Sequence, residues 1–464
     1  MMQAAAMRRK MWRGRDALRL FALLAVLVMA LWLHSSSAAA VGQGGRYEGV
    51  ASCAGSTCHG RTEGDGKVVR QDELRIWQEP SDQSGAHSRA FAALGSARGQ
   101  RIAATLGLGS AAAAPACLGC HATTPRAGRQ GDRFLLADGV GCESCHGASS
   151  GWLASHYTVA GTHAANVAQG MVALENPRAR ASVCLDCHFG SSKPGQFVSH
   201  RMMAAGHPRL VFELDLFSAL QQHHDEDADY AQRKGRTDSV RLWAIGQAAA
   251  VQRSLSLYTN ASLATEGVFP EFTFYDCHSC HRAIDDRPDR KRSFEANPGR
   301  PIPFGMPPYN DENIIMLSAV AQALTPGHAA RFDAASRSFH AAIGAGRSEA
   351  IAAARRLDAA AGALSGALAL GREGESAFTV IAAISGRAIS PRFTDYAGSA
   401  QAVMAVDTLL NALVRQGRIT VGAAAGIRGH ISRSYAAVSS PATYDPAAFR
   451  ASLGEAARNI AALR

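Results

Sequence analysis

The ten cysteines constrain this chain more than any other feature, because they occur only in pairs and a histidine directly follows each pair. In four pairs, two residues separate the cysteines, as in Cys142-Glu143-Ser144-Cys145-His146. The other three pairs with this spacing are Cys117 and Cys120 before His121, Cys184 and Cys187 before His188, and Cys277 and Cys280 before His281. The first pair in the chain, Cys53 and Cys58 before His59, has four intervening residues.

A Cys-x-x-Cys-His segment is the attachment signature of c-type haem. Each thiol adds to one vinyl group of the porphyrin, and the adjacent imidazole then reaches the iron. We therefore predict five covalently attached haems c, counting the wider loop at Cys53, since such loops are known among multihaem cytochromes. The predicted proximal iron ligands are His59, His121, His146, His188 and His281.

Other uses of paired cysteines explain the pattern less well. Zinc knuckles and thiol redox sites also contain Cys-x-x-Cys. A zinc site takes four ligands from two knuckles, and it does not require a histidine after every second cysteine. A disulfide framework is also a poor explanation, because bridges that close two-residue loops staple nothing together.

The first forty residues are typical of an export signal. Basic side chains precede an apolar run at residues 20–33, and small residues from Ser35 to Ala40 suit signal peptidase. The run is shorter than the about 20 residues that a membrane-spanning helix needs, so we favour cleavage near Ala40 over an uncleaved anchor. Haem attachment takes place outside the cytoplasm, and we expect the protein in the periplasm.

The charge of the chain gives no support for nucleic acid as a partner. The formal net charge is +10, but the first forty residues carry six Lys or Arg and one Asp, which leaves +5 for the remainder. Each ferric haem with two histidine ligands adds about −1, from two propionates against one net iron–porphyrin charge. Five haems bring the exported protein close to neutrality.

The distribution of residues predicts a mainly α fold with two parts after the signal segment at residues 1–40. Residues 41–305 are loop-rich and hold all the cysteine motifs, whereas residues 306–464 are rich in alanine and lack cysteine. We predict a pentahaem cytochrome domain followed by an all-α helical bundle. The predicted bundle helices span residues 312–324, 328–343, 348–370, 376–389, 396–415, 421–438 and 446–463. Residues 208–264 are predicted mostly helical, with a charged turn at 225–238.

The axial position opposite each proximal histidine distinguishes an electron carrier from an enzyme, because a second protein ligand, water or substrate can occupy it. We interpret His328, His340 and His430 as surface or packing residues of the bundle, and Met171, Met202 and Met203 as core residues. His223, at the end of the helical face 210–221, is favoured for the haem at His59 or at His281, with His224 and His278 as close competitors. The remaining candidates for the five positions are His87, His156, His163, His200, His207, His223, His224 and His278.

His200 and His207 are predicted to serve two different irons. Residues 197–205 can form about two helical turns, from which His200 projects sideways. Gly206 is a natural helix terminator, and Pro208 disfavours the α conformation at His207. His207 should therefore leave the helix and point in another direction from His200.

The chain resembles the multihaem c-type cytochromes related to the tetrahaem carrier of ammonia-oxidising bacteria, which serves hydroxylamine oxidoreductase. The similarity covers roughly residues 46–285 and lies mainly in the order of the motifs. The matching segments are Tyr47-Glu48-Gly49 before Cys53, Trp77 followed by His87-Ser88-Arg89-Ala90, GVGCESCHG followed by Trp152 and His156, Val198-Ser199-His200 after the Cys184 motif, AAGHPRLVFEL, and YDCHSCHR.

The resemblance implies that His87, His156, His200 and His207 are distal ligands and that the haems form closely stacked pairs. Two departures limit it, namely five motifs instead of four and a helical C-terminal part that the carrier lacks. We expect an exported protein that relays electrons between other redox proteins. The bundle could also dock to a membrane complex or form a homo-oligomer. The alternative is an oxidoreductase acting on a small nitrogen or sulfur compound at one open haem, although no motif has Lys in place of the proximal His, as pentahaem nitrite reductases do.

Overall fold

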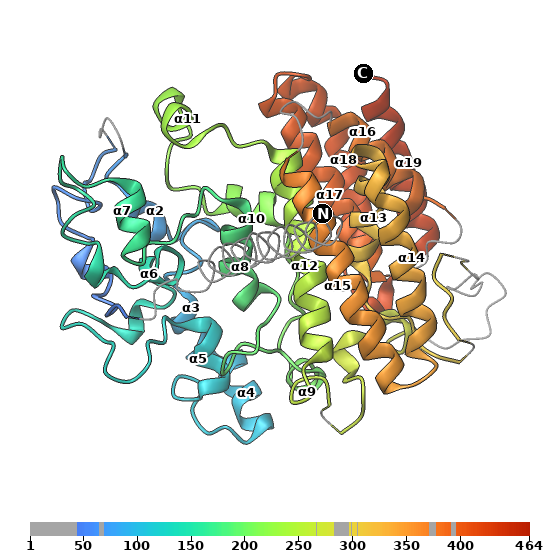
Figure 1. The fold of residues 1–464 in the computed structure, drawn as a ribbon, viewed down its shortest axis with the longest axis horizontal. Helices are drawn as coiled ribbons and strands as arrows, with labels where there is room; N and C mark the ends of the chain where they lie inside the picture. The colour runs from blue at the N-terminus through green and yellow to red at the C-terminus, as the bar shows by residue number, and fades with distance from the viewer. Residues whose placement is uncertain are drawn as a thin grey trace, which may run out of the picture.

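The computed structural model describes residues 44–64, 69–265, 267–282, 297, 299–303, 305–370, 377–390 and 396–464. As predicted, the fold is mainly α, and these residues contain isolated bridges, such as the one between Tyr47 and Gln130, but no strand. Figure 1 shows short helices and loops on one side and long packed helices on the other. The predicted export signal lies outside the described residues and stays a prediction.

Seven long helices form the C-terminal bundle, and each corresponds to a helix predicted from the sequence. They are α13 (Glu312–Leu324), α14 (Pro326–Ile343), α15 (Arg347–Ala369), α16 (Ala377–Ala388), α17 (Tyr396–Arg415), α18 (Val421–Ala437) and α19 (Pro446–Ala461). Capping residues mark the first turn of several of these helices. The Thr420 side chain accepts a hydrogen bond from the Ala423 N–H at the start of α18, and the Asp445 side chain accepts from the Ala447 and Ala448 N–H groups at the start of α19. The predicted bounds of α13 and α17 agree with the structure.

An eighth long helix, α12 (Ser239–Thr259), precedes the bundle in the chain but packs along α15 (Figure 1). Its Trp243 and Tyr258 side chains are fully buried in the same core cluster as Phe332 and Leu357 of the bundle. The polypeptide before residue 305 therefore contributes one helix to the bundle core. The domain limit at residue 305 stays a prediction.

The region that carries the cysteine motifs is built from short helices joined by loops. They are α2 (Glu73–Trp77), α3 (Ala90–Leu94), α4 (Ala97–Leu106), α5 (Pro115–His121), α6 (Cys142–His146), α7 (His163–Ala168), α8 (Pro177–His188), α9 (His200–Ala204), α10 (Leu214–Leu220) and α11 (Ala228–Lys234), with the 3-10 turns η2 (Val50–Ser52) and η6 (Cys277–Ser279). Asn176 caps α8 and Pro177 begins it, a favoured pair at a helix start.

Two local predictions in this region are wrong. The charged segment 225–238 contains a helix, α11, because the Asp227 side chain caps its start by accepting from the Tyr230 N–H. The segment 197–205 does not form two turns. Ser199 accepts from the Met202 N–H, so it caps α9 instead of lying within a helix, and only five residues are helical.

Among the described helices, α17 alone is long and apolar enough to cross a membrane, with a mean hydropathy of 1.2 over its best window. The structure buries 78% of that window inside the bundle. This degree of burial is ordinary for the core helix of a bundle.

Candidate functional site

Three of the five cysteine motifs lie on one face of an α-helix. In α5, α6 and α8 the two cysteines lie three residues apart and the histidine follows at the fourth position, at the C-terminal end of each helix. Residues three and four apart are neighbours on a helix surface, so both thiols and the imidazole face the same side. This arrangement suits a flat group attached at two points and ligated at its centre.

The wider loop at Cys53 returns its histidine to a similar place. The His59 N–H donates to the Cys53 carbonyl at 3.2 Å across six residues, and the Cys58 N–H donates to Gly55 at 2.8 Å. In the last motif the His281 N–H donates to the Cys277 carbonyl at 2.8 Å across four residues. The two extra residues of the first motif therefore form part of a turn. In both motifs the histidine lies beside the first cysteine.

Each proximal histidine faces a second histidine ring across a gap of similar width. The ring centroids are 6.2 Å apart for His59 and His156, 6.4 Å for His121 and His207, 6.2 Å for His146 and His223, 6.0 Å for His188 and His87, and 6.0 Å for His281 and His200. Imidazoles on opposite sides of one iron lie about 6 Å apart, since each metal–nitrogen bond measures about 2 Å and each ring centre lies about 1 Å behind its nitrogen. The five pairs fit this spacing.

Hydrogen bonds orient several of these imidazoles. The Nδ1–H groups of four of them donate to backbone carbonyls, which leaves Nε2 as the ligating nitrogen. The bonds run from His121 to Ala90 at 2.9 Å, from His156 to Leu153 at 2.6 Å, from His207 to Pro208 at 2.7 Å and from His223 to Gln221 at 2.7 Å. In His59 the Nδ1 group instead contacts the Glu73 carboxylate at 2.9 Å.

Burial keeps the central imidazoles neutral, as iron binding requires. Burial lowers the pKa of His146 to about 3 and that of His188 to about 4. Burial also lowers the pKa of His223 to about 4. Although burial opposes it, the His224 and His59 imidazoles hold the pKa of Glu73 well below its usual range, so this carboxylate is ionised.

One iron position has two candidate distal histidines. The rings of His223 and His224 both lie 6.2 Å from His146 and 4.3 Å from each other. The ligand nitrogens of all three lie within 4.8 Å of one another. The sequence favoured His223 as the partner of His59 or His281, but in the structure these two face His156 and His200, and His223 faces His146. Ring spacing alone does not separate His223 from His224.

The remaining histidines have other contacts. His163 pairs through Nε2 with Glu175 at 2.6 Å, and His278 contacts the Pro441 carbonyl through Nδ1 at 2.7 Å. His340, which the sequence assigns to packing, is fully buried in the bundle, where both ring nitrogens form hydrogen bonds, to Asp311 and to Ser336. In His163 and His340 these contacts occupy the Nε2 atom that an iron would need. The His278 ring instead packs edge-on against Tyr444, with 5.0 Å between the ring centroids.

Neighbouring motifs approach one another through their cysteines. The Cys53 and Cys142 thiols are neighbours, and their interaction raises the pKa of Cys53 and lowers that of Cys142. The Cys120 and Cys187 thiols are also neighbours, and their interaction raises the pKa of Cys120 and lowers that of Cys187. Burial, with a smaller effect of the nearby fourth-motif cysteines, raises the pKa of Cys145 to about 12. The motifs therefore pair first with third and second with fourth, and the third also lies close to the fourth.

The α9 segment connects the second motif to the fifth. His200, its first residue, faces His281, and His207, just after its end, faces His121. Gly206 separates them with a φ of +111°, a conformation that suits glycine and turns the chain between the two. One short element thus presents imidazoles to two different proximal histidines, as the sequence predicts.

The fifth motif is also fixed to the bundle. Asp276 accepts a hydrogen bond from the Ser279 N–H at the start of η6 and another from the Ala397 N–H of α17. Arg209, close to Cys277, pairs with Glu312 of α13 at 3.0 Å. No local sequence pattern indicates these contacts, because they join positions far apart in the chain.

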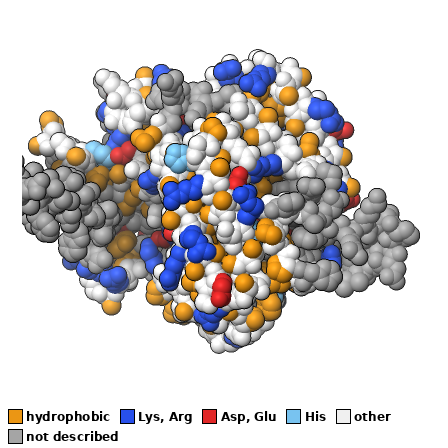
Figure 2. Space-filling model, turned by 45° about the vertical axis from the view of Figure 1, so that its right-hand side comes forward, with side chains coloured by type: hydrophobic (Ala, Val, Ile, Leu, Met, Phe, Trp, Pro, Cys, Tyr) orange, Lys and Arg blue, Asp and Glu red, His pale blue; other side chains and the backbone are white. Residues whose placement is uncertain are grey.

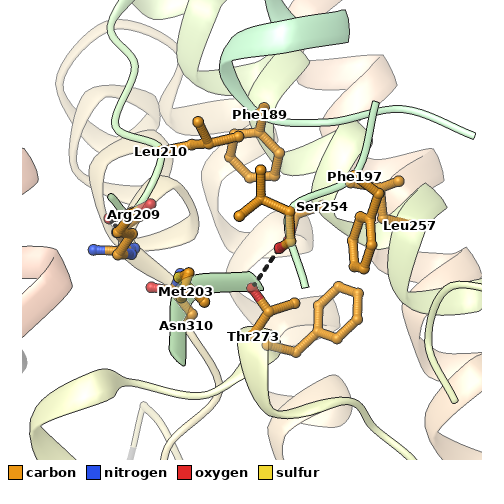
Figure 3. A pocket seen from close by; sticks show the side chains of 12 residues that line it. Phe189, Phe197, Met203, Arg209, Leu210, Ser254, Leu257, Thr273 and Asn310 are labelled. Atoms are coloured by element: carbon orange, nitrogen blue, oxygen red, sulfur yellow. Dashed lines mark hydrogen bonds and ion pairs between the residues drawn. The ribbon is translucent and has the colours of Figure 1, made fainter. Parts of the chain in front are cut away.

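A small cavity lies where the motif region meets α12 and α13. Figure 3 shows its lining, in which Phe189 follows the fourth motif and the Thr273 hydroxyl donates to the Val198 carbonyl at 3.4 Å. Its volume is about 60 Å³. Pockets for small molecules measure roughly 300–1,000 Å³, so we assign no substrate to this cavity.

Comparisons with known proteins agree with this geometry over part of the chain. The family model described as Cytochrome c554 and c-prime matches residues 52–147, which contain the first three motifs. No curated protein and no solved structure matches the chain. The family match supports a c-type cytochrome with covalently bound haem c and a redox role.

Proposed function

We propose that this chain is an exported pentahaem c-type cytochrome that relays electrons between redox partners and makes no bonds itself. The observation that carries the proposal is the second histidine opposite each of the five proximal histidines, at 6.0–6.4 Å between ring centroids. When bound, haem c supplies reversible one-electron chemistry at its iron. With both axial positions taken by protein, no place remains for a substrate.

In this proposal the ten cysteines hold the haems and ten histidines ligate the irons. Each proximal histidine is assigned the partner that it faces. We choose His223 over His224 because its Nδ1–H donates to a backbone carbonyl, as do those of three other assigned ligands. The assigned pairs are His59 with His156, His121 with His207, His146 with His223, His188 with His87 and His281 with His200.

The contacts between motifs support a single relay in the spatial order first, third, fourth, second and fifth. The first three steps follow the cysteine contacts, and the last step follows α9. Cys58 of the first motif and Cys280 of the fifth are exposed, whereas the other eight cysteines are partly buried. Redox partners would therefore dock at the two ends of the series.

The bundle supports the fifth motif and offers a separate surface. Figure 2 shows basic side chains scattered over this face of the molecule, with few acidic ones. Exposed arginines on α14 and α15 include Arg331, Arg337 and Arg355. Such a face suits an acidic redox partner or a membrane complex, with a second copy of the chain as the competing occupant.

Mass spectrometry of the secreted protein tests the export and haem loading. We expect a mature chain that starts near Val41 and carries five thioether-bound haems. Four haems with free thiols at Cys53 and Cys58 would remove the wide-loop site from the proposal. Bound zinc in place of haem would overturn all of it.

Paramagnetic resonance of the ferric protein tests the relay against the oxidoreductase. We expect five low-spin haems whose spectra do not change with cyanide, nitrite or hydroxylamine, because no axial position is exchangeable. A high-spin haem, together with turnover of a small nitrogen or sulfur compound, would instead establish the oxidoreductase.

A further inference from the structure

Glu73 brings a buried carboxylate to two neighbouring haem sites. It begins α2, and its side chain is only 8% exposed. One carboxylate oxygen accepts from Nδ1 of His59 at 2.9 Å, and the other lies 3.4 Å from Nδ1 of His224 and accepts from the Gln71 N–H at 3.1 Å. Sequence reasoning missed this residue, because only the fold brings it to these histidines.

The charge on this acceptor distinguishes His59 from the other candidate ligands. The Nδ1 groups of His121, His156, His207 and His223 donate to neutral backbone carbonyls. The nearby Arg70 and Arg75 pair with other carboxylates, Arg70 with Asp72 and Asp225 and Arg75 with Asp72. Within the described residues, His59 is thus the candidate ligand whose Nδ1 contacts a carboxylate.

A carboxylate that accepts the Nδ1–H of an axial histidine makes that imidazole a stronger donor to the metal. A more basic ligand and a buried negative charge both favour the ferric over the ferrous state. Both effects lower the midpoint potential of the haem at His59, the first in the proposed series. Electrons flow from low to high potential, so this end would receive them.

The second contact of Glu73 bears on the choice between His223 and His224. Both rings are equally distant from His146, but only the Nδ1 of His223 forms a hydrogen bond to a carbonyl. Nδ1 of His224 is buried without a hydrogen bond and lies at ion-pair distance from Glu73. The carboxylate therefore attracts His224, and His223 can approach the iron.

We propose that Glu73 is a positioning residue that lowers the potential of the haem at His59, so that electrons enter at the first motif, and that retains His224 so that His223 ligates the iron opposite His146. This inference rests on the proposed bis-histidine haems. It assigns to one side chain both the direction of the relay and a choice of ligand.

Redox titration followed by paramagnetic resonance tests the first part in the fully loaded protein. Glu73→Gln keeps an acceptor for His59 and removes the charge. We expect five low-spin haems, with the lowest midpoint potential shifted upward and the other four little changed. Glu73→Asp keeps the charge, so it should show a smaller upward shift than Glu73→Gln. Glu175→Gln is the matched control, because it removes the same charge from a pair with His163 that faces no iron, and it should shift none of the potentials.

Ligand variants test the second part. His223→Ala should convert one haem to high spin while His224→Ala leaves all five low-spin. In the double variant His223→Ala with Glu73→Gln, released His224 should restore the low-spin state. Unchanged potentials in Glu73→Gln, or a high-spin haem in His224→Ala alone, would overturn the role of Glu73 while the relay stands. Fewer than five low-spin haems in the parent protein would overturn the proposed function instead.

Discussion

The motif region and the bundle bury apolar side chains very differently. In the bundle, together with α12, one continuous cluster includes Trp243, Phe332, Phe339 and Phe449, all fully buried. In the motif region the buried clusters are small, with six residues around Leu185 and three around Ala103. Most motif-region helices are also shorter than the about 12–15 residues at which an isolated helix becomes even marginally stable.

This difference indicates where each region obtains its stability. The bundle follows the usual rule, in which amphipathic helices bury a shared apolar face. The motif region has too little side-chain core to offset the entropy of ordering its loops. Large apolar macrocycles can supply that missing core, so its folding should be coupled to haem attachment, whereas that of the bundle should not.

The largest effect should follow from producing the chain without haem. Residues before α12 should then be open to protease, because their helices are short and their core clusters small. The helices α12–α19 should survive as one resistant fragment whose new end lies near Ser239. Limited proteolysis with mass analysis would show this fragment. Equal protection of the whole haem-free chain would contradict the comparison.

Replacing distal histidines should act locally within the motif region. His200→Ala and His207→Ala should each convert one haem to high spin, and a different haem in each case, because their rings face His281 and His121. All five haems should remain attached. His340→Ala is the control from the bundle, since it removes a buried imidazole bonded to Asp311 and should leave every haem low-spin. Two variants that alter the same haem would refute the assignment.

Core substitutions in the two regions should lower the free energy of unfolding by different amounts. Leu357→Ala in α15 removes a fully buried side chain from the large cluster and should lower the free energy of unfolding of the bundle by about 2–5 kcal/mol. Leu94→Ala, within the three-residue cluster, should cost less, about 1–2 kcal/mol, because fewer neighbours surround the cavity. Calorimetry of the loaded protein measures both. A larger loss for Leu94→Ala than for Leu357→Ala would mean that the small clusters of the motif region matter for stability as much as the bundle core does.

The same contrast explains how far the sequence predicts the structure. The bundle helices follow from local periodicity and caps, and residues such as Thr420 and Asp445 mark their starts. In the motif region the signature determines the attachment points but not the partners. His59 faces His156 and His188 faces His87, and such contacts depend on loops whose path no local pattern encodes. Glu73 could not be distinguished from a surface acid for the same reason.

The smallest effect concerns the ion pair that joins the two regions. Arg415 of α17 contacts the Asp215 carboxylate of α10 at 2.6 Å, and Asp215 is 6% exposed whereas Arg415 is 46% exposed. Burial raises the pKa of Asp215 to about 6, although Arg415 and Ser239 lower it. The folded state therefore binds this proton more tightly than the unfolded state, whose pKa is 3.8. The ionised carboxylate costs stability above about pH 6 and none below about pH 4.

Arg415→Met removes the compensating cation, so its effect should grow as pH rises through that window. We expect a loss of about 1 kcal/mol in the free energy of unfolding at pH 8, kept small because water screens the half-exposed arginine, and almost no loss at pH 5, where Asp215 is protonated. Arg418→Met, which removes an equally charged and exposed side chain three residues away, should show no such pH dependence. Denaturant unfolding at both pH values measures the difference. An equal loss at pH 5 and pH 8 would show that Arg415 acts by packing and that the two regions are not joined through this charge.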